Sequence, residues 1–146
     1  MALALGGITN GVSTLEMAGA YGAIANDGEY ITPTFYSRVE DANGNIILQP
    51  KQERRRVLSV DNAYIVKSIL TQPVYGGSGT ATFAKIPGIQ TAAKTGTTDA
   101  DFDRWLCGFT PYYTAATWFG YRLNEQVRYS RKSSRTYMGF GNEVSS

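Results

Sequence analysis

The sequence contains no histidine and only one cysteine in its 146 residues. Without histidine, the chain cannot assemble a Ser-His-Asp or Cys-His catalytic group from its own residues, and it lacks the commonest zinc ligand. Cys107 cannot form a disulfide within the chain, and its apolar neighbours Leu106 and Phe109 indicate a buried core residue rather than a nucleophile. Any chemistry must therefore use lysine, carboxylates, hydroxyls or the backbone.

Long apolar runs and a strong net charge are also lacking. No stretch approaches the ~20 apolar residues of a membrane-spanning helix, and the start MALALGG lacks the basic region and cleavage site of a signal peptide, so we expect any export signal to lie elsewhere. The net charge of +2 gives no argument for nucleic acid as a partner. We therefore interpret the arginine clusters as solvated loops: residues 54–56, and Arg122, Arg128, Arg131 and Arg135.

Two helices are predicted in the first half of a chain whose composition, 42% hydrophobic and 18% charged, indicates a packed core. The capping box at residues 13–16 (STLE) begins the first helix, and Gly28 suits the left-handed C′ position after its end. Ser59 caps a second helix, which Pro73 and the glycine-rich run at residues 76–79 are expected to end.

The remaining segments predict strands. Residues 30–39, the turn dipeptide Asn43-Gly44 and residues 46–48 indicate a β-hairpin with a two-residue turn, and residues 50–56 are interpreted as a polar connector. Trp105 and Trp118 are expected to pack on a sheet. Its three short strands cover residues 90–98, 104–109 and 114–121, with residues 110–113 linking the last two.

The run Lys94-Thr95-Gly96-Thr97-Thr98 is unusual for a strand, because glycine weakens strands and lysine resists burial. Strand alternation places Thr95 and Thr97 on one side and Lys94 on the other, while Gly96 lets a ligand approach the backbone. Such an edge can pair with an extended peptide, bind a carboxylate through its hydroxyls and point an amide at a developing oxyanion. Taken alone, the run favours an ordinary exposed edge, where lysine protects against aggregation.

A phosphate-binding loop is a further alternative for this run. Residues 88–95 match the phosphate-loop pattern at every fixed position except Ala93, which replaces a glycine. The residues after Lys94 are a poor helix start, and no apolar run ending in aspartate supplies a magnesium ligand. Both observations weaken the nucleotide-binding hypothesis.

The wider pattern resembles a known family. KTGTT, followed by DRWLCGFTP at residues 103–111 and ATWFGY at residues 116–121, is similar to the C-terminal half of a penicillin-binding protein transpeptidase domain, most like the class A (bifunctional) group. The upstream segments LALGG, GVSTLEMAGAYGAIANDG and Gly77-Ser78-Gly79 follow that group in the same order. The resemblance covers residues 1–121 and implies an α+β, serine β-lactamase/transpeptidase-like fold, with an antiparallel sheet flanked by helices, present as a partial domain. Residues 122–146 are then a polar tail or ragged terminal strand.

The resemblance also implies roles for the run. Lys94, Thr95 and Gly96 correspond to the third active-site motif of the family, and the Thr97 amide to an oxyanion donor. By the resemblance, the catalytic groups of this chain would be Lys94 and the Thr97 amide. The substrate-binding residues would be Thr95, Gly96, Thr97 and Thr98, with Thr95 and Thr97 holding the carboxylate of the substrate or of a β-lactam. No metal or organic cofactor is implied. The sequence departs from the family at Ala93, where glycine is usual, and at Ser78, where threonine is usual.

The SxxK nucleophile and SxN motifs of the family occur at no serine of the chain. Residues 91–94 (TAAK) imitate SxxK, but that motif needs a helical turn to bring its ends together, so Thr91 is not the expected nucleophile. We therefore expect an upstream segment to supply the nucleophile, the general base and a sheet-completing strand, which leaves this chain inactive alone. Without that segment, we expect the chain to expose an apolar surface.

As a whole, the domain is expected to be a peptidoglycan DD-transpeptidase on the extracytoplasmic face of the bacterial cell membrane. It would cross-link stem peptides ending in D-Ala-D-Ala through a serine acyl-enzyme and be acylated by β-lactams. Its partners would be stem peptides, β-lactams and the missing N-terminal part of the domain. Hydrolysis of β-lactams and a non-catalytic module that binds cell-wall peptide remain open alternatives.

Overall fold

The computed structural model describes residues 11–98 and 102–121, and the predicted tail at residues 122–146 lies outside them. Two α-helices and seven β-strands are present in this part of the chain, together with a short 3₁₀ helix at Thr82–Ala84. In chain order they are α1 (Thr14–Ala25), β1 (Glu29–Ile31), β2 (Val39–Glu40), β3 (Ile46–Leu48), β4 (Arg54–Arg56), α2 (Val60–Tyr75), β5 (Ala92–Thr97), β6 (Asp103–Phe109) and β7 (Thr114–Gly120).

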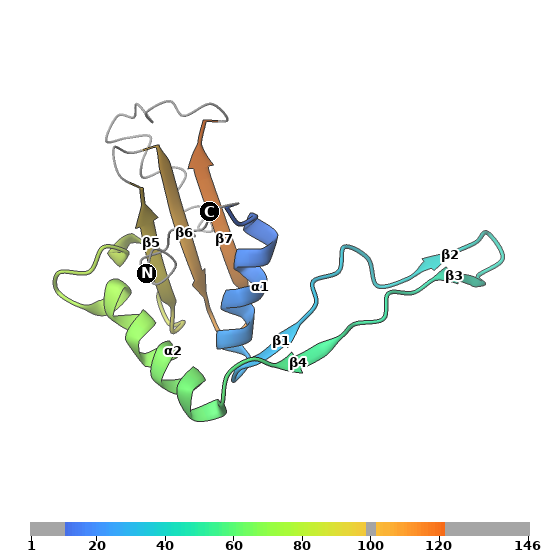
Figure 1. The fold of residues 1–146 in the computed structure, drawn as a ribbon, viewed down its shortest axis with the longest axis horizontal. Coiled ribbons are helices and arrows are strands. Elements are labelled where there is room, and N and C mark those ends of the chain that lie inside the picture. Colours follow the sequence, from blue (N-terminus) through green and yellow to red (C-terminus); the bar gives the residue numbers. More distant parts are fainter. Residues whose placement is uncertain (1–10, 99–101, 122–146) are drawn as a thin grey trace.

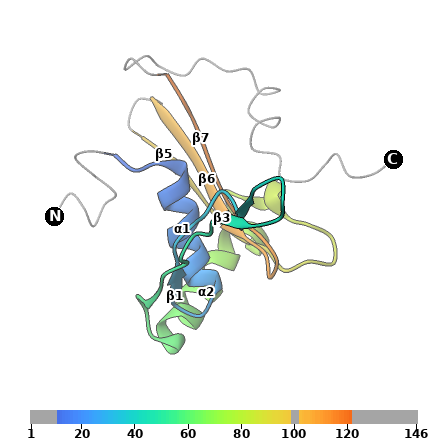
Figure 2. The ribbon, with the colours of Figure 1, turned by 90° about the vertical axis from the view of Figure 1, so that its right-hand side faces the viewer.

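The central feature is an antiparallel sheet with the strand order β5-β6-β7 (Figure 1). Figure 2 shows this sheet from its side, with α1 lying along one face, where the helix contacts β6 and β7. Helix α2 contacts β5 and also α1. The three predicted strands and the tight link at residues 110–113 are confirmed, as is the predicted α+β fold class.

Both ends of α1 follow from its sequence, with one difference. The Ser13 hydroxyl accepts from the Glu16 amide at 3.2 Å, and the Glu16 carboxylate accepts from the Ser13 amide at 2.8 Å, which confirms the capping box. The helix ends at the cap residue Asn26, so the C′ position falls on Asp27, with φ 51°, rather than on the expected Gly28. Gly28 also has a positive φ, and a side chain there would meet the Leu58 carbonyl oxygen at 2.3 Å.

The predicted hairpin forms, but its strands are shorter and its turn is longer. Only the two ends of the run at residues 30–39 are extended, as parts of β1 and β2, and five residues, 41–45, separate β2 from β3. The side chain of Asp41 accepts from the amides of Asn43 and Asn45, and this extra pairing favours the wider loop. Residues 29–56 form an arm that extends away from the sheet, and Figure 1 shows β2 and β3 at its far end.

The interpretation of residues 50–56 as a connector was wrong at its end. Residues Arg54–Arg56 form β4, which pairs antiparallel with β1. The guanidinium of Arg54 lies 3.5 Å from the Glu29 carboxylate, and that of Arg55 lies 5.3 Å from the centre of the Tyr30 ring. These contacts join segments 25 residues apart, so propensity within the run could not reveal them.

Helix α2 begins as predicted and ends at the predicted glycine-rich run, with Gly76 as its C-cap residue. The Ser59 hydroxyl accepts from the Asn62 amide at 3.2 Å, which confirms the cap. Pro73 does not end the helix, which continues to Tyr75. Proline lacks the N–H that would bond to the carbonyl four residues earlier, and its ring crowds that carbonyl. Its own carbonyl accepts from the Ala81 amide at 2.9 Å, beyond the end of the helix.

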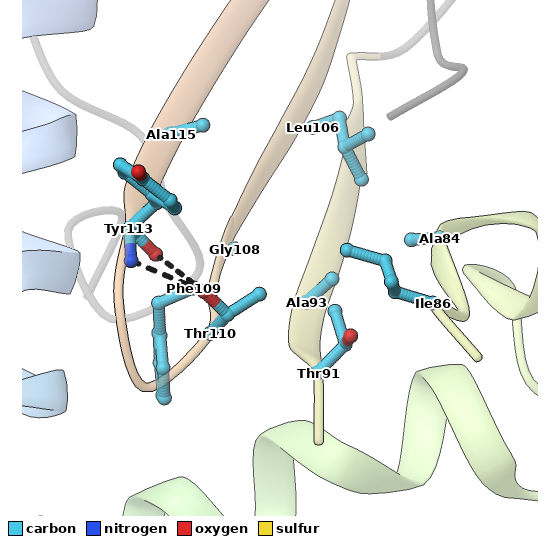
Figure 3. A pocket seen from close by; sticks show the side chains of 10 residues that line it. All are labelled: Ala84, Ile86, Thr91, Ala93, Leu106, Gly108, Phe109, Thr110, Tyr113 and Ala115. Carbon is cyan, nitrogen blue, oxygen red and sulfur yellow. Dashed lines mark hydrogen bonds between the residues drawn. The ribbon is translucent and has the colours of Figure 1, made fainter. Parts of the chain in front are cut away.

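The core lies on the face of the sheet opposite α1. It consists of small and aliphatic side chains, with Phe83 packed against them: Val74, Ala81, Ala84, Ala93 and Leu106. Further along this face the side chains leave an apolar hollow of about 320 Å³, which Leu106, Tyr113 and Ala115 help to line (Figure 3). This open apolar hollow agrees with the expectation that the chain exposes apolar surface when the upstream segment is absent.

Cys107 lies in the middle strand β6 and is 3% exposed, so it is a core residue as predicted. Burial raises the pKa of its thiol to about 11, and burial also raises the pKa of the Tyr21 hydroxyl on α1 to about 12. Both groups are therefore neutral at physiological pH. A thiol kept protonated by its surroundings is a poor nucleophile.

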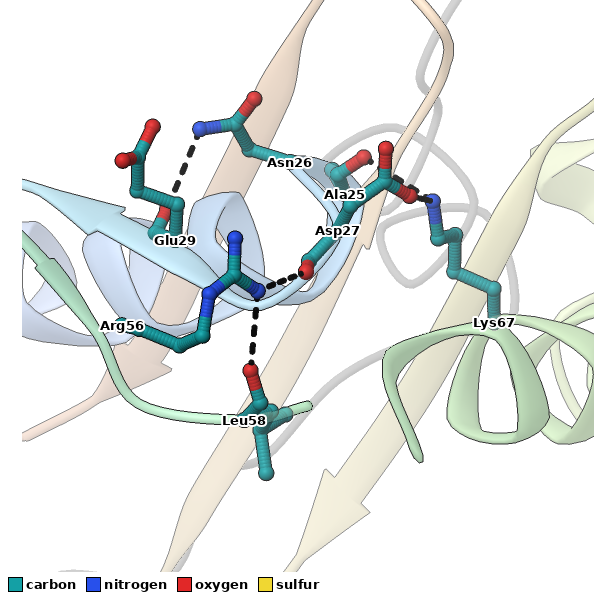
Figure 4. A network of polar contacts seen from close by, with 7 residues as sticks. All are labelled: Ala25, Asn26, Asp27, Glu29, Arg56, Leu58 and Lys67. Atoms are coloured by element: carbon teal, nitrogen blue, oxygen red, sulfur yellow. Dashed lines mark hydrogen bonds and ion pairs between the residues drawn. The ribbon is translucent and has the colours of Figure 1, made fainter. Parts of the chain in front are cut away.

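A polar junction ties the arm to the two helices (Figure 4). The Lys67 ammonium on α2 donates to the Asp27 carboxylate at 2.5 Å and to the Ala25 carbonyl at 3.3 Å. The Arg56 guanidinium on β4 donates to the carbonyls of Asp27 and Leu58 at 2.9 and 3.2 Å. The hydrogen bond from Lys67 and its positive charge lower the pKa of the Asp27 carboxyl.

Candidate functional site

The predicted site run lies on and just beyond β5, and it is accessible. Lys94, Thr97 and Thr98 are exposed, while Thr95 and Gly96 are half-buried. Among the described residues, β5 pairs with β6 on one side only, so its other edge is free. The segment is an extended strand and not a loop that precedes a helix, which makes the phosphate-loop hypothesis wrong.

The register of the sheet determines which backbone groups face the free edge. The Thr98 amide donates to the Asp103 carbonyl at 3.1 Å, which identifies these two residues as a hydrogen-bonded pair. Hydrogen-bonded and non-hydrogen-bonded pairs alternate along an antiparallel ladder, so the backbone groups of Lys94 and Gly96 also point toward β6. The N–H and C=O groups of Thr95 and Thr97 therefore point away from β6, to the free edge.

Lysine and threonine side chains gather at this same edge. The Lys94 ammonium donates to the Thr95 carbonyl at 2.5 Å, which places a positive charge beside the outward-facing backbone. The Thr95 hydroxyl lies 3.0 Å from the Thr80 hydroxyl. Across the strand, a side chain at Gly96 would meet the Cβ atom of Trp105 at 3.3 Å, so glycine keeps this part of β5 close to β6.

A second set of polar contacts holds the end of the site strand. The Thr98 hydroxyl accepts from the Asp103 amide at 2.8 Å, and the Asp103 carboxylate accepts from the Trp118 indole at 2.8 Å. Asp103 was not singled out from the sequence, and Trp118 was expected only to pack. The two predicted strands and their tight link could have indicated this contact. Pairing β6 with β7 across that link places Asp103 opposite Gly120, two residues from Trp118.

Thr91, which imitates the nucleophile position, has structural contacts instead. It is 5% exposed, its amide donates to the Tyr75 hydroxyl at 3.0 Å and its own hydroxyl donates to the Ile89 carbonyl at 3.3 Å. These bonds hold the chain just before β5. The structure therefore supports the prediction that Thr91 is not the nucleophile.

The site strand does not line the cavities described here. Residues 94–98 contribute to neither the apolar hollow nor the cavity of about 560 Å³ between α2 and the sheet, to which Lys67, Gln90 and Phe109 contribute. In residues 11–98 and 102–121, no cluster of aspartate, glutamate and cysteine side chains is arranged to hold a metal ion. Neither described helix is long and apolar enough to cross a membrane.

Known proteins share both the sequence and the fold. The family described as "Penicillin binding protein transpeptidase domain" matches residues 1–139. Penicillin-binding protein 1A of Clostridium acetobutylicum is 42% identical over 119 residues, which are 82% of this chain and 14% of that protein. Penicillin-binding protein 1F of Bacillus subtilis is 39% identical over 140 residues, which are 92% of this chain and 19% of that protein. The chain thus spans less than a fifth of the length of these relatives.

Solved structures agree with this relationship. The D,D-transpeptidase domain of a peptidoglycan glycosyltransferase from Eggerthella lenta superimposes with a TM-score of 0.59 and 34% identity, covering 70% of this chain and 25% of that one. Penicillin-binding protein 1A from Haemophilus influenzae has the same fold, with a TM-score of 0.67 over 80% of this chain and 23% of that one, at 22% identity. The sequence and the fold together establish that the chain belongs to the penicillin-binding protein transpeptidase domain family.

Proposed function

We propose that this chain is the C-terminal part of the catalytic domain of a peptidoglycan DD-transpeptidase, and that residues 94–98 bind its substrate. The supporting observation is the free edge of β5, where the Thr97 amide and the Thr95 carbonyl face outward beside the Lys94 ammonium. An extended stem peptide can pair with that edge through main-chain hydrogen bonds. The family relationship, which joins the chain to penicillin-binding proteins, agrees with this function.

Each group at the edge has a defined role in this proposal. The terminal carboxylate of the D-Ala-D-Ala peptide, or that of a β-lactam, accepts from the hydroxyls of Thr95 and Thr97. The Thr97 amide donates to the oxygen that becomes negative when the carbonyl is attacked. Lys94 supplies positive potential to both anions. Gly96 and Thr98 keep the strand close to β6, so the donors stay in place.

The covalent chemistry is the work of a serine in another segment of the domain. The serine oxygen attacks the carbonyl carbon of the D-Ala-D-Ala bond, the peptide C–N bond breaks, and the proton that the serine hydroxyl gives up passes through the general base to the amine of the departing D-Ala. An amine of a neighbouring stem peptide then attacks the acyl-enzyme, which forms the cross-link and regenerates the serine. On this hypothesis the domain acts at the outer face of the cell membrane, and residues 1–121 and the missing part complete one sheet.

The first test uses a complete domain that includes this chain and a fluorescent penicillin that labels the serine. Replacing Lys94 with alanine should lower the acylation rate by about 100-fold, similar to the loss of a principal oxyanion contact. Lys51→Ala is the matched control, because Lys51 is an exposed lysine on the arm, outside the sheet. Equal acylation of the Lys94→Ala and control domains would refute the proposed function.

The second test isolates the Thr97 amide. That N–H faces the free edge and takes no part in the β5–β6 ladder, so proline is compatible with this position of an edge strand. Thr97→Pro removes both the amide proton and the hydroxyl, whereas Thr97→Val removes the hydroxyl alone. The proline variant should acylate about 100-fold more slowly than the valine variant. Similar rates in the two folded variants would exclude the amide as an oxyanion donor.

A further inference from the structure

The loop between α2 and β5 presents a hydroxyl to the site strand. Thr80 lies 15 residues before Thr95, and its hydroxyl accepts from the Thr95 hydroxyl at 3.0 Å. Thr80 itself is exposed, so this contact is not a consequence of core packing. In the proposed function, the Thr95 hydroxyl binds the ligand carboxylate. Thr80 is therefore the polar neighbour of a group that binds the ligand.

The backbone on both sides of Thr80 is tightly held. On one side, a side chain at Gly79 would lie 2.2 Å from the Pro73 carbonyl oxygen, so the loop is pressed against the end of α2. On the other side, Ala81 is fully buried in the core, and its amide donates to that same carbonyl at 2.9 Å. The close packing of Gly79 on α2 and the burial of Ala81 in the core therefore fix the backbone of Thr80 beside β5.

The chemistry of a hydroxyl pair gives this arrangement a consequence. A hydroxyl carries one proton and two acceptor lone pairs, and its proton rotates to suit its partners. When the Thr95 proton is donated to Thr80, as in this structure, Thr95 offers a ligand carboxylate only lone pairs, which repel it. When Thr80 donates instead, the proton of Thr95 is free for the carboxylate, and the chain of two bonds strengthens each of them.

We propose that Thr80 is a positioning residue for carboxylate recognition, and that the bond between the two hydroxyls reverses when a ligand binds, so that Thr80 donates its proton to Thr95. The inference rests on the proposed function, since it assumes that Thr95 meets a ligand carboxylate. The ligands concerned are the terminal carboxylate of a stem peptide and the carboxylate of a β-lactam. Thr80 touches neither the ligand nor the reacting atoms, so its effect must pass through Thr95.

The test measures both the initial binding constant and the acylation rate constant of a complete domain with a penicillin and with its carboxylate methyl ester. The Thr80→Val variant removes the donor and keeps the shape of the side chain, and Thr80→Ser restores the hydroxyl. Thr80→Ala is a second variant without a donor, for use if valine disturbs folding. Circular dichroism and thermal unfolding confirm the fold of each variant.

Thr80→Val and Thr80→Ala should weaken the initial binding of the penicillin about fivefold, while the serine variant stays within about twofold of the parent. Binding of the methyl ester should not change. In a Thr95→Val background, a further change at Thr80 should have no effect, because the residue through which it acts is gone. A valine and alanine effect below twofold in the parent background, or an equal effect in the Thr95→Val background, would overturn the inference.

The outcomes also separate this inference from the proposed function. If Thr95→Val weakens penicillin binding and the Thr80 variants do not, the proposed function survives and the inference fails. If both Thr95→Val and Lys94→Ala leave acylation unchanged, the proposed function fails, and the role of Thr80 fails with it. The two results therefore cannot be confused.

Discussion

Replacing Gly79 with alanine should destabilise the domain, and replacing its neighbour Gly77 should not. The added Cβ atom at position 79 would lie 2.2 Å from the oxygen and 2.7 Å from the carbon of the Pro73 carbonyl. Both are backbone atoms in a helix, so neither can rotate away. At Gly77 no atom lies within 4 Å of the added carbon. Neither glycine has a positive φ, so alanine is conformationally allowed at both positions.

The size of the effect follows from what the clash displaces. The loop must move by about 1 Å to restore an ordinary contact, which breaks the 2.9 Å bond from the Ala81 amide to the Pro73 carbonyl. Leaving that buried amide without a partner costs about 1–3 kcal/mol. Withdrawing the fully buried Ala81 methyl from the core costs about 0.8 kcal/mol more. Both variants lose the same freedom in the unfolded chain, so the difference between them should be about 2–4 kcal/mol.

The measurement is urea unfolding of both variants in a complete domain, followed by tryptophan fluorescence and circular dichroism. Gly79→Ala should have a lower transition midpoint than Gly77→Ala with an unchanged slope. The same displacement moves Thr80 away from Thr95, so penicillin binding should also weaken in the folded Gly79→Ala variant. Equal midpoints for the two variants would show that the loop is not pressed against α2 as described.

Three further outcomes are expected. Asp103→Ala should lower stability by about 1 kcal/mol, because Trp118 loses an acceptor, while Asp103→Asn keeps the acceptor and most of the stability; equal losses in urea unfolding would contradict this. The pKa of the Cys107 thiol is raised from 9.0 to about 11 in the folded state, so its contribution to stability is complete below pH 9 and is lost as the pH rises toward 11. Cys107→Ala should therefore show a shallower alkaline loss of stability in thermal scans, and an unchanged slope would count against a buried neutral thiol. The pKa of Asp27 is lowered chiefly by Lys67, so the stability from this pair is present above the ordinary pKa of 3.8 and is lost as the pH falls below it; Lys67→Met should reduce that acid dependence, and an identical acid profile would exclude the pair as its source.

Local signals in the sequence determined much of the fold. The capping box at Ser13, the cap at Ser59 and the three alternating strands of the sheet appear where the pattern places them. Each depends on contacts within a few residues or on a period that a strand or helix imposes by itself. The run at residues 94–98 was identified as extended for the same reason.

Contacts between distant residues could not be foreseen in this way. Arg54–Arg56 forms a strand because β1 offers it a partner, and α2 continues past Pro73 to Tyr75, where the Pro73 carbonyl accepts from the Ala81 amide. Neither partner is adjacent in sequence, and propensity carries no information about which distant segment will meet an edge or a carbonyl. The wider turn at residues 41–45 depends instead on local contacts, because the side chain of Asp41 accepts from nearby amides and competes with the expected two-residue turn.

The candidate site was also predicted in part from the sequence and decided in part by the fold. Residue types marked the run as unusual, since Lys94 and Gly96 depart from what an ordinary strand prefers, and the resemblance to the family then assigned roles to Lys94, Thr95, Gly96 and Thr97. The fold then decided which of their groups can reach a ligand, because the direction of each N–H depends on the register with β6, and the neighbour of Thr95 depends on where α2 ends. Hydrogen-bond direction and side-chain proximity are properties of paired segments, so they exist only once the chain has folded.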